Sequence, residues 1–120
     1  MLGIGVNGHI AFNEPGSERD SRARVVTLTP ESRAAHADAF GSLDRVPARG
    51  MTLGIADILA ARRILVLATG AGKAAIVERI LEGPMTAAVP ASWLQPHADV
   101  TWLLDAAAAS RLPRGEPDAD

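Results

Sequence analysis

A histidine, an amide and a carboxylate lie close together near the start of the chain. His9 follows Gly8, with Asn7 two positions before it and Glu14 five positions after it. A histidine titrates near neutral pH, and a nearby carboxylate can fix its tautomer and stabilise its cationic form. The adjacent glycine allows a substrate to approach the backbone closely. These residue types predict a proton-transfer site, the alternative being a capped turn in which His9 is merely hydrogen-bonded.

A second candidate is Lys73, which follows the glycine-rich turn 70–72. The turn separates an apolar run from an expected helix, where backbone N–H groups, the positive helix end and an ammonium can together hold one phosphate. A P-loop is disfavoured, because Leu67 occupies the place of its first glycine and Ala74 the place of its Ser or Thr. Two interpretations stand: a single-phosphate site at Lys73, or a tight turn with a solvated lysine.

The first residues also match the GxGxxG pattern, from Gly3 to Gly8. A dinucleotide-binding fold needs that pattern to end a full strand and to open a helix. Here Pro15 and Gly16 stop any long helix soon after the pattern. The dinucleotide interpretation is therefore disfavoured.

Alternating strand and helix patterns must position these residues. The continuous apolar run within residues 63–69 is typical of a strand that is covered on both faces of a parallel sheet. The alternation predicts an α/β fold with a largely parallel sheet and flanking helices. Strands are expected at residues 1–5, 25–28, 63–69 and 100–104, and helices or helical turns at residues 29–40, 52–61, 73–81, 91–94 and 106–112.

Composition excludes several classes of protein. A formal net charge of -2 gives no electrostatic reason to expect nucleic acid or an anionic membrane as a partner. A cysteine count of 0 excludes disulfides, thiolate metal sites and cysteine nucleophiles. No apolar run approaches the roughly 20 residues that span a bilayer. We therefore expect a cytoplasmic protein without a nucleic-acid or membrane partner.

Residues 5–16 read GVNGHIAFNEPG, which closely resembles the signature of the glucosamine-6-phosphate deaminase/isomerase family. Sister enzymes that hydrolyse 6-phosphogluconolactone share the Gly-x-Gly-His core but typically continue toward Ser-Leu-Phe-Pro, where this chain has Phe-Asn-Glu-Pro at residues 12–15. The difference favours the aminosugar branch. The resemblance continues in the expected order through residues 21–24, 27–29, 46–47, 51–55, 69–74 and 92–97, and it covers nearly the whole chain up to about Leu104.

The resemblance implies a partial Rossmann-like sheet and the conversion of an aminohexose 6-phosphate to fructose 6-phosphate and ammonia. By resemblance, His9 handles the proton on the ring oxygen during ring opening, Glu14 holds and tunes the imidazole, and Asn7 assists. Many family members carry Asp at the place of Asn7, so here the pKa of His9 is expected to depend more on Glu14. Lys73 matches the family's phosphate-binding lysine. The resemblance implies no metal or organic cofactor and a small-molecule hexosamine phosphate as partner, and it leaves a homo-oligomer open.

The chain departs from the family pattern in two ways. Where the family has an arginine that contacts the substrate phosphate, this chain has Asp38, and Arg33 or Arg49 is a candidate to compensate. The family's N-terminal half also carries a glycine-rich phosphate loop and the carboxylate that moves a proton between C1 and C2. We therefore expect residues 1–112 to be the C-terminal half of such a domain, residues 113–120 to be a disordered tail, and this chain alone to have little or no activity.

Other functions remain open on the sequence alone. The enzyme alternatives are a galactosamine-6-phosphate deaminase and a 6-phosphogluconolactonase-like enzyme. A non-catalytic module that binds sugar phosphates through the His9 and Lys73 pockets is a third alternative, and a degenerate fragment without a function of its own is a fourth.

Overall fold

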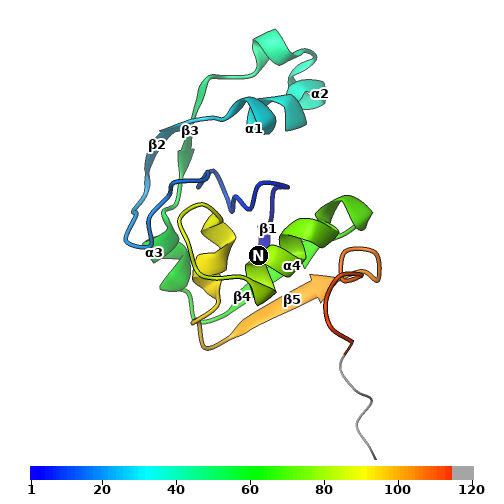
Figure 1. Ribbon diagram of the computed structural model, residues 1–120. Coiled ribbons are helices and arrows are strands. Elements are labelled where there is room, and N and C mark those ends of the chain that lie inside the picture. Colours follow the sequence, from blue (N-terminus) through cyan, green and yellow to red (C-terminus); the bar gives the residue numbers. More distant parts are fainter. Residues whose placement is uncertain (115–120) are drawn as a thin grey trace, which may run out of the picture.

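A three-stranded parallel sheet forms the base of the computed structural model, which describes residues 1–114 (Figure 1). Strand β4 (Ile64–Ala68) lies in the middle, between β1 (Leu2–Gly3) and β5 (Val100–Leu104), and both pairings are parallel. Helix α4 (Ala74–Glu82) follows β4 and packs back against the sheet. The expected α/β fold with a parallel sheet is confirmed.

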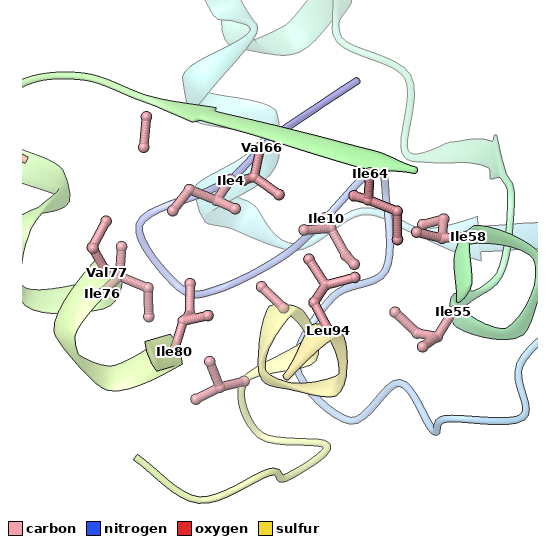
Figure 2. Close-up of a cluster of buried hydrophobic side chains, with 13 residues drawn as sticks. Ile4, Ile10, Ile55, Ile58, Ile64, Val66, Ile76, Val77, Ile80 and Leu94 are labelled. Atoms are coloured by element: carbon pink, nitrogen blue, oxygen red, sulfur yellow. The ribbon is translucent and has the colours of Figure 1, made fainter. Parts of the chain in front are cut away.

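The hydrophobic core lies on one face of this sheet. Figure 2 shows side chains from β4, α4, the helix α3 (Ile55–Leu59), the 3-10 helix η3 (Pro90–Leu94) and the N-terminal loop converging on a common centre. Ile10 is completely buried there, so the loop that carries His9 is anchored by its own apolar side chain. The cluster consists of Ile4, Ile10, Ile55, Ile58, Ile64, Val66, Ala68, Ile76, Val77, Ile80, Val89, Ala91 and Leu94.

The opposite face of the sheet is open in the described part of the chain. Residues alternate along β4, so that Val66 is buried while Leu65 and Leu67 remain 42% and 46% exposed. Leu103 on β5 lies beside Leu67 in the strand register and is equally exposed. The expectation that this apolar run is covered on both faces is therefore wrong for residues 1–114, because the described helices pack on the Val66 side.

A second sheet, an antiparallel pair of strands, lies apart from the parallel sheet. Strands β2 (Arg24–Thr27) and β3 (Arg49–Thr52) pair with each other, and helices α1 (Pro30–Ala35) and α2 (Ala37–Phe40) lie beyond them (Figure 1). The single helix expected at residues 29–40 is instead interrupted at His36, whose backbone angles are φ −103° and ψ 1°.

Two further expectations need correction. Residues 49–52 form strand β3, and the helix expected from residue 52 begins only at Ile55, because pairing with β2 takes the preceding residues. Residues 106–112 form turns instead of a helix, with the Asp105 carboxylate accepting from the N–H groups of Ala108 and Gly70. In the tail expected at 113–120, residues 115–120 lie outside the described residues.

Candidate functional site

The loop that carries His9 is a tight turn that only glycine permits at two positions. Gly8 has φ +87°, and a Cβ added there would lie 2.7 Å from the Cγ1 atom of Val89. A Cβ added to Gly5 would lie 2.0 Å from the imidazole of His9, so the ring rests directly on the Gly5 backbone. The Gly8 carbonyl also accepts from the Ala91 N–H at 2.9 Å, which fixes the turn to η3. The sequence therefore folds locally into a rigid support for one imidazole.

Asn7 forms a hydrogen bond with the imidazole. Its Oδ1 lies 2.7 Å from Nδ1 of His9, and its Nδ2 donates to Oε2 of Glu14 at 3.1 Å. Glu14 itself stands 4.0 Å from Nδ1 of His9. The sequence-based expectation gives the holding role to Glu14 and an assisting role to Asn7, whereas the structure places Asn7 between the other two.

This arrangement fixes the tautomer of His9. The amide nitrogen of Asn7 faces a carboxylate, so its oxygen faces the ring, and an amide oxygen only accepts hydrogen bonds. Nδ1 must therefore carry a proton, which leaves Nε2 as the unprotonated acceptor of the neutral ring. Within residues 1–114, Nε2 has no hydrogen-bond partner.

Two hydroxyl groups hold Glu14 from the start of α1. Thr29 donates to Oε2 of Glu14 at 3.0 Å, and Ser32 donates to Oε1. Thr29 is also the N-cap of α1 and accepts from the Ser32 N–H at 3.1 Å. Ser32 is 1% exposed and Glu14 7% exposed, so water does not compete for the carboxylate. Sequence reasoning missed both hydroxyls: the Thr-Pro-Glu pattern predicts a helix start but does not show what that start faces.

A buried amide and an arginine tie the loop to the β2–β3 pair. Asn13 is completely buried and donates to the carbonyls of Ile10 and Leu53 at 3.0 and 2.8 Å. Arg24 on β2 donates to the side-chain oxygen of Asn13 at 2.9 Å and to Ser17 at 3.2 Å. These contacts, which the sequence did not reveal, fix the far end of the loop.

Lys73 lies near the same loop although it is distant in sequence. It ends the 3-10 helix η2 (Ala71–Lys73), directly before α4, and its Nζ donates to the carbonyl of Ile4. Burial lowers the pKa of Lys73 below its usual value. The structure thus brings Asn7, His9, Glu14 and Lys73 together beyond the carboxyl ends of β1 and β4, where open α/β sheets commonly bind ligands.

The protonation of His9 depends on several opposing influences. Burial lowers the pKa of His9, and it is the largest influence. The negative charge of Glu14 acts in the opposite direction, whereas Lys73 and His36 lower the pKa further. The balance favours a neutral imidazole, which can accept a proton at Nε2.

A cavity of about 470 Å³ opens beside His9, a volume within the range of small-molecule sites. Its walls include Ile4, Phe12, His36 and Met51. The sequence did not single out His36.

Asp38, the departure from the family pattern, lies outside the walls of this cavity, and so do Arg33 and Arg49, the candidates to compensate for it. The guanidinium of Arg33 donates to the carbonyl of Val46 at 3.1 Å and so holds the chain that follows α2. Arg49 lines a neighbouring cavity of about 240 Å³, and Asp38 is exposed on α2. The absence of a metal or organic cofactor stays a prediction. Residues 1–114 contain no group of three side chains able to hold a metal ion. No helix in the described part of the chain is long and apolar enough to cross a membrane.

Comparison with known proteins identifies relatives along nearly the whole chain. Glucosamine-6-phosphate deaminase from Rhodopirellula baltica is 56% identical over 112 residues, covering 93% of this chain and 45% of the relative. Glucosamine-6-phosphate deaminase 1 from Bacillus subtilis is 50% identical over 113 residues, covering 94% and 47%. The chain therefore spans about half the length of the curated relatives it matches.

Solved structures give the same picture. The structure described as a monomeric glucosamine-6-phosphate deaminase superposes with a TM-score of 0.88 and 51% identity, covering 91% of this chain and 45% of the other. A 6-phosphogluconolactonase from Trypanosoma brucei is more distant, with a TM-score of 0.67 and 34% identity over 93% and 41% of the two chains. The sequence model of the family described as "Glucosamine-6-phosphate isomerases/6-phosphogluconolactonase" matches residues 1–102. The chain belongs to the glucosamine-6-phosphate isomerase/6-phosphogluconolactonase family.

Proposed function

We propose that this chain supplies the ring-opening site of a glucosamine-6-phosphate deaminase, which converts glucosamine 6-phosphate to fructose 6-phosphate and ammonia. The observation that carries the proposal is the Asn7 bridge, which orients His9 at 2.7 Å and connects it to the buried carboxylate of Glu14. The relatives that are 56% and 50% identical to this chain over the matched residues are named as deaminases, which favours this activity over lactone hydrolysis.

Ring opening is a proton transfer that one imidazole can perform. The bond between C1 and the ring oxygen breaks while the ring oxygen gains a proton and the C1 hydroxyl loses one. Neutral His9 accepts the hydroxyl proton at Nε2 and returns a proton to the ring oxygen. The imidazolium formed between these two events is stabilised by the negative charge of Glu14, which lies 4.0 Å from Nδ1.

Lys73 supports the binding of the phosphate in this proposal. Lys73 is the N-cap residue of α4, a nine-residue helix whose positive end adds to the charge of the lysine. Burial already lowers the pKa of Lys73, and a bound phosphate dianion would favour its charged form. The ligand is then a small hexosamine phosphate in the cytoplasm, and no cofactor takes part.

The isomerisation that follows ring opening needs a further base. No carboxylate is among the residues that line the described cavity beside His9. We propose that residues 1–112 form the C-terminal half of a deaminase domain and that the base belongs to the part of the longer relatives that this chain does not match. One catalytic proton-transfer group contributes about 10²–10⁴-fold in rate. Residues 1–120 alone should therefore release ammonia slowly or not at all.

A chimera tests the proposed function. The matched region of the Bacillus subtilis relative is replaced by this chain, and ammonia release is measured with glucosamine 6-phosphate, with galactosamine 6-phosphate, and beside hydrolysis of 6-phosphogluconolactone. We expect deamination of glucosamine 6-phosphate that falls by about 10²–10⁴-fold in His9→Asn. Lactone hydrolysis without ammonia release would identify the lactonase alternative. Binding of sugar phosphate without any turnover would identify a non-catalytic module.

A further inference from the structure

His36 is a second imidazole in the cavity that His9 occupies. Both residues line the space of about 470 Å³. His36 lies at the interruption between α1 and α2. As the C-cap of α1, its backbone N–H donates to the carbonyls of Arg33 and Ala34. The break turns the chain at this residue, and the side chain consequently meets the cavity instead of continuing along a helix face.

The ring of His36, an exposed residue, makes an aromatic contact. Its centroid lies 6.0 Å from that of Phe12, and the two rings meet edge to face at 78°. Phe12 and His36 also line the neighbouring cavity of about 240 Å³, so the pair forms a wall between the two spaces. Such a contact restricts the imidazole without using its nitrogen atoms, neither of which has a hydrogen-bond partner in the described part of the chain.

Two imidazoles and no carboxylate are among the described residues that line this cavity, a combination that suits an anionic ligand. His9 and His36 are the ionisable residues that line it, and Lys73 and His36 are both close enough to lower the pKa of His9. Among the described residues, Glu14 is the one carboxylate acting on His9, and it is buried and already accepts from Asn7, Thr29 and Ser32.

In the described part of the chain, no charged side chain outside the cavity forms an ion pair with His36. Arg49 on β3 borders the adjoining cavity and is a further cation. Arg33 on α1 donates to the carbonyls of Leu43 and Val46, and Asp38 on α2 is exposed to solvent. Among the described residues, the neighbouring cavity that His36 also borders has no carboxylate in its walls either.

We propose that His36 is a substrate-binding residue that, in its cationic form, holds the phosphate of the sugar together with Lys73. The inference rests on the proposed function, which supplies a sugar phosphate as the ligand. His9 then governs the rate of ring opening, whereas His36 governs affinity and makes it depend on pH. His36 approaches the ligand from the α1–α2 break and Lys73 from the start of α4, so the two reach His9 from separate elements.

Affinity for fructose 6-phosphate, with inorganic phosphate as a second probe, tests the inference without requiring turnover. The chain contains 3 histidines, so their ring proton resonances can be assigned in the NMR spectrum with single variants. The quantity of interest is the ratio of the Kd of His36→Asn to that of the parent chain, because the titration of the phosphate itself cancels in this ratio. We expect a ratio of about 10 near pH 6 and close to 1–2 near pH 8.5, since a charge-assisted hydrogen bond is worth roughly twice a neutral one.

Two variants sharpen the result. His36→Lys keeps its charge at both pH values, so the ratio of its Kd to that of the parent chain should be about 1 near pH 6 and below 1 near pH 8.5. His97→Asn is the control: His97 contacts Ala61 and Asp99 away from the cavity, and its loss should leave both ratios at about 1. A fold check by NMR accompanies each variant.

The inference is overturned if the ratio for His36→Asn is the same at both pH values, or if ligand shifts the His9 resonance and leaves that of His36 unmoved. Absence of saturable binding up to about 10 mM of either ligand also overturns it. Failure of the proposed function has a different signature: His36-dependent binding persists, but the chimera releases no ammonia or its rate is insensitive to His9→Asn.

Discussion

The Oδ1 atom of Asn7 lies 2.7 Å from Nδ1 of His9, closer than any oxygen of Glu14. An uncharged amide therefore sets the tautomer of the imidazole, and the carboxylate acts through space at 4.0 Å. The separation matters because hydrogen bonding and charge affect the ring differently. Asn7 determines which nitrogen is free, and Glu14 determines how stable the protonated ring is.

Asn7→Asp should raise the pKa of His9. A negative charge next to Nδ1 favours the imidazolium, opposing the lowering that burial now causes. The same change removes the N–H that Asn7 donates to Glu14 and sets two carboxylates side by side. The two carboxylates repel each other, so one of them takes up a proton more readily, and this reduces part of the added negative charge. NMR titration of the His9 ring protons measures the shift, with His97 as an internal reference. A His9 titration midpoint that is unchanged or lower in Asn7→Asp would contradict the role given to Asn7.

The sequence was most informative where one residue type decides the local structure. Strand β5 is found at the expected residues 100–104, and β4 lies within the expected run 63–69, because short apolar runs of this length favour a strand even when only one face is covered. Strand β3 was missed because Arg49-Gly50-Met51-Thr52 has no strand pattern of its own and exists through its pairing with β2.

The candidate site shows the same limit. His9, Asn7 and Glu14 belong to one short loop, so their proximity could be predicted from the sequence. Ser32 and His36 lie near the site because of where α1 is placed in the fold. The position of α1 in turn depends on how the β2–β3 pair packs over the loop. The order of contacts, with Asn7 ahead of Glu14, depends on distances of about an ångström that a pattern of residues does not encode.

Stability should fall with decreasing pH in a way that depends on His9. Burial lowers the pKa of His9 in the folded chain below the ordinary value of 6.5, so the unfolded chain binds more protons in the window below 6.5. This group therefore destabilises the fold as pH drops from 6.5 toward the folded-state pKa and has no effect well above 6.5. Urea unfolding at several pH values should show a shallower dependence in His9→Gln than in the parent. Equal slopes in the two proteins would rule out this contribution.

Ser32→Ala should destabilise the chain by about 1–3 kcal/mol, because it leaves one oxygen of the buried Glu14 without its hydroxyl donor. Ser42→Ala is the matched control, since Ser42 is exposed and its side chain makes no capping bond. That change should stay within about 0.5 kcal/mol. Denaturant unfolding compares the two. In the chimera, Ser32→Ala should also lower kcat more than it raises KM, as expected for a residue that positions Glu14.

Gly8→Ala and Gly16→Ala should separate backbone strain from steric overlap. Both glycines have positive φ, +87° and +99°, so alanine costs roughly 1–2 kcal/mol at either position. At Gly8 the new Cβ also lies 2.7 Å from Val89, whereas at Gly16 nothing lies within 4 Å. Overpacking adds about 1–3 kcal/mol at Gly8 alone. Thermal unfolding measures both variants, and equal costs would show that the turn can move away from Val89.

Val66 and Leu67 are neighbours on β4 that point to opposite faces of the sheet, and their truncation should differ sharply. Val66 is completely buried, so Val66→Ala should cost about 2 kcal/mol from lost burial and the cavity left behind. Leu67 is 46% exposed, and Leu67→Ala should cost less than about 1 kcal/mol. Urea unfolding of the two variants at equal protein concentration makes the comparison. Parallel sheets are usually covered on both faces, so an equal cost would mean that another surface covers Leu67 in solution. Sedimentation at several concentrations would then show whether that surface is a second copy of the chain.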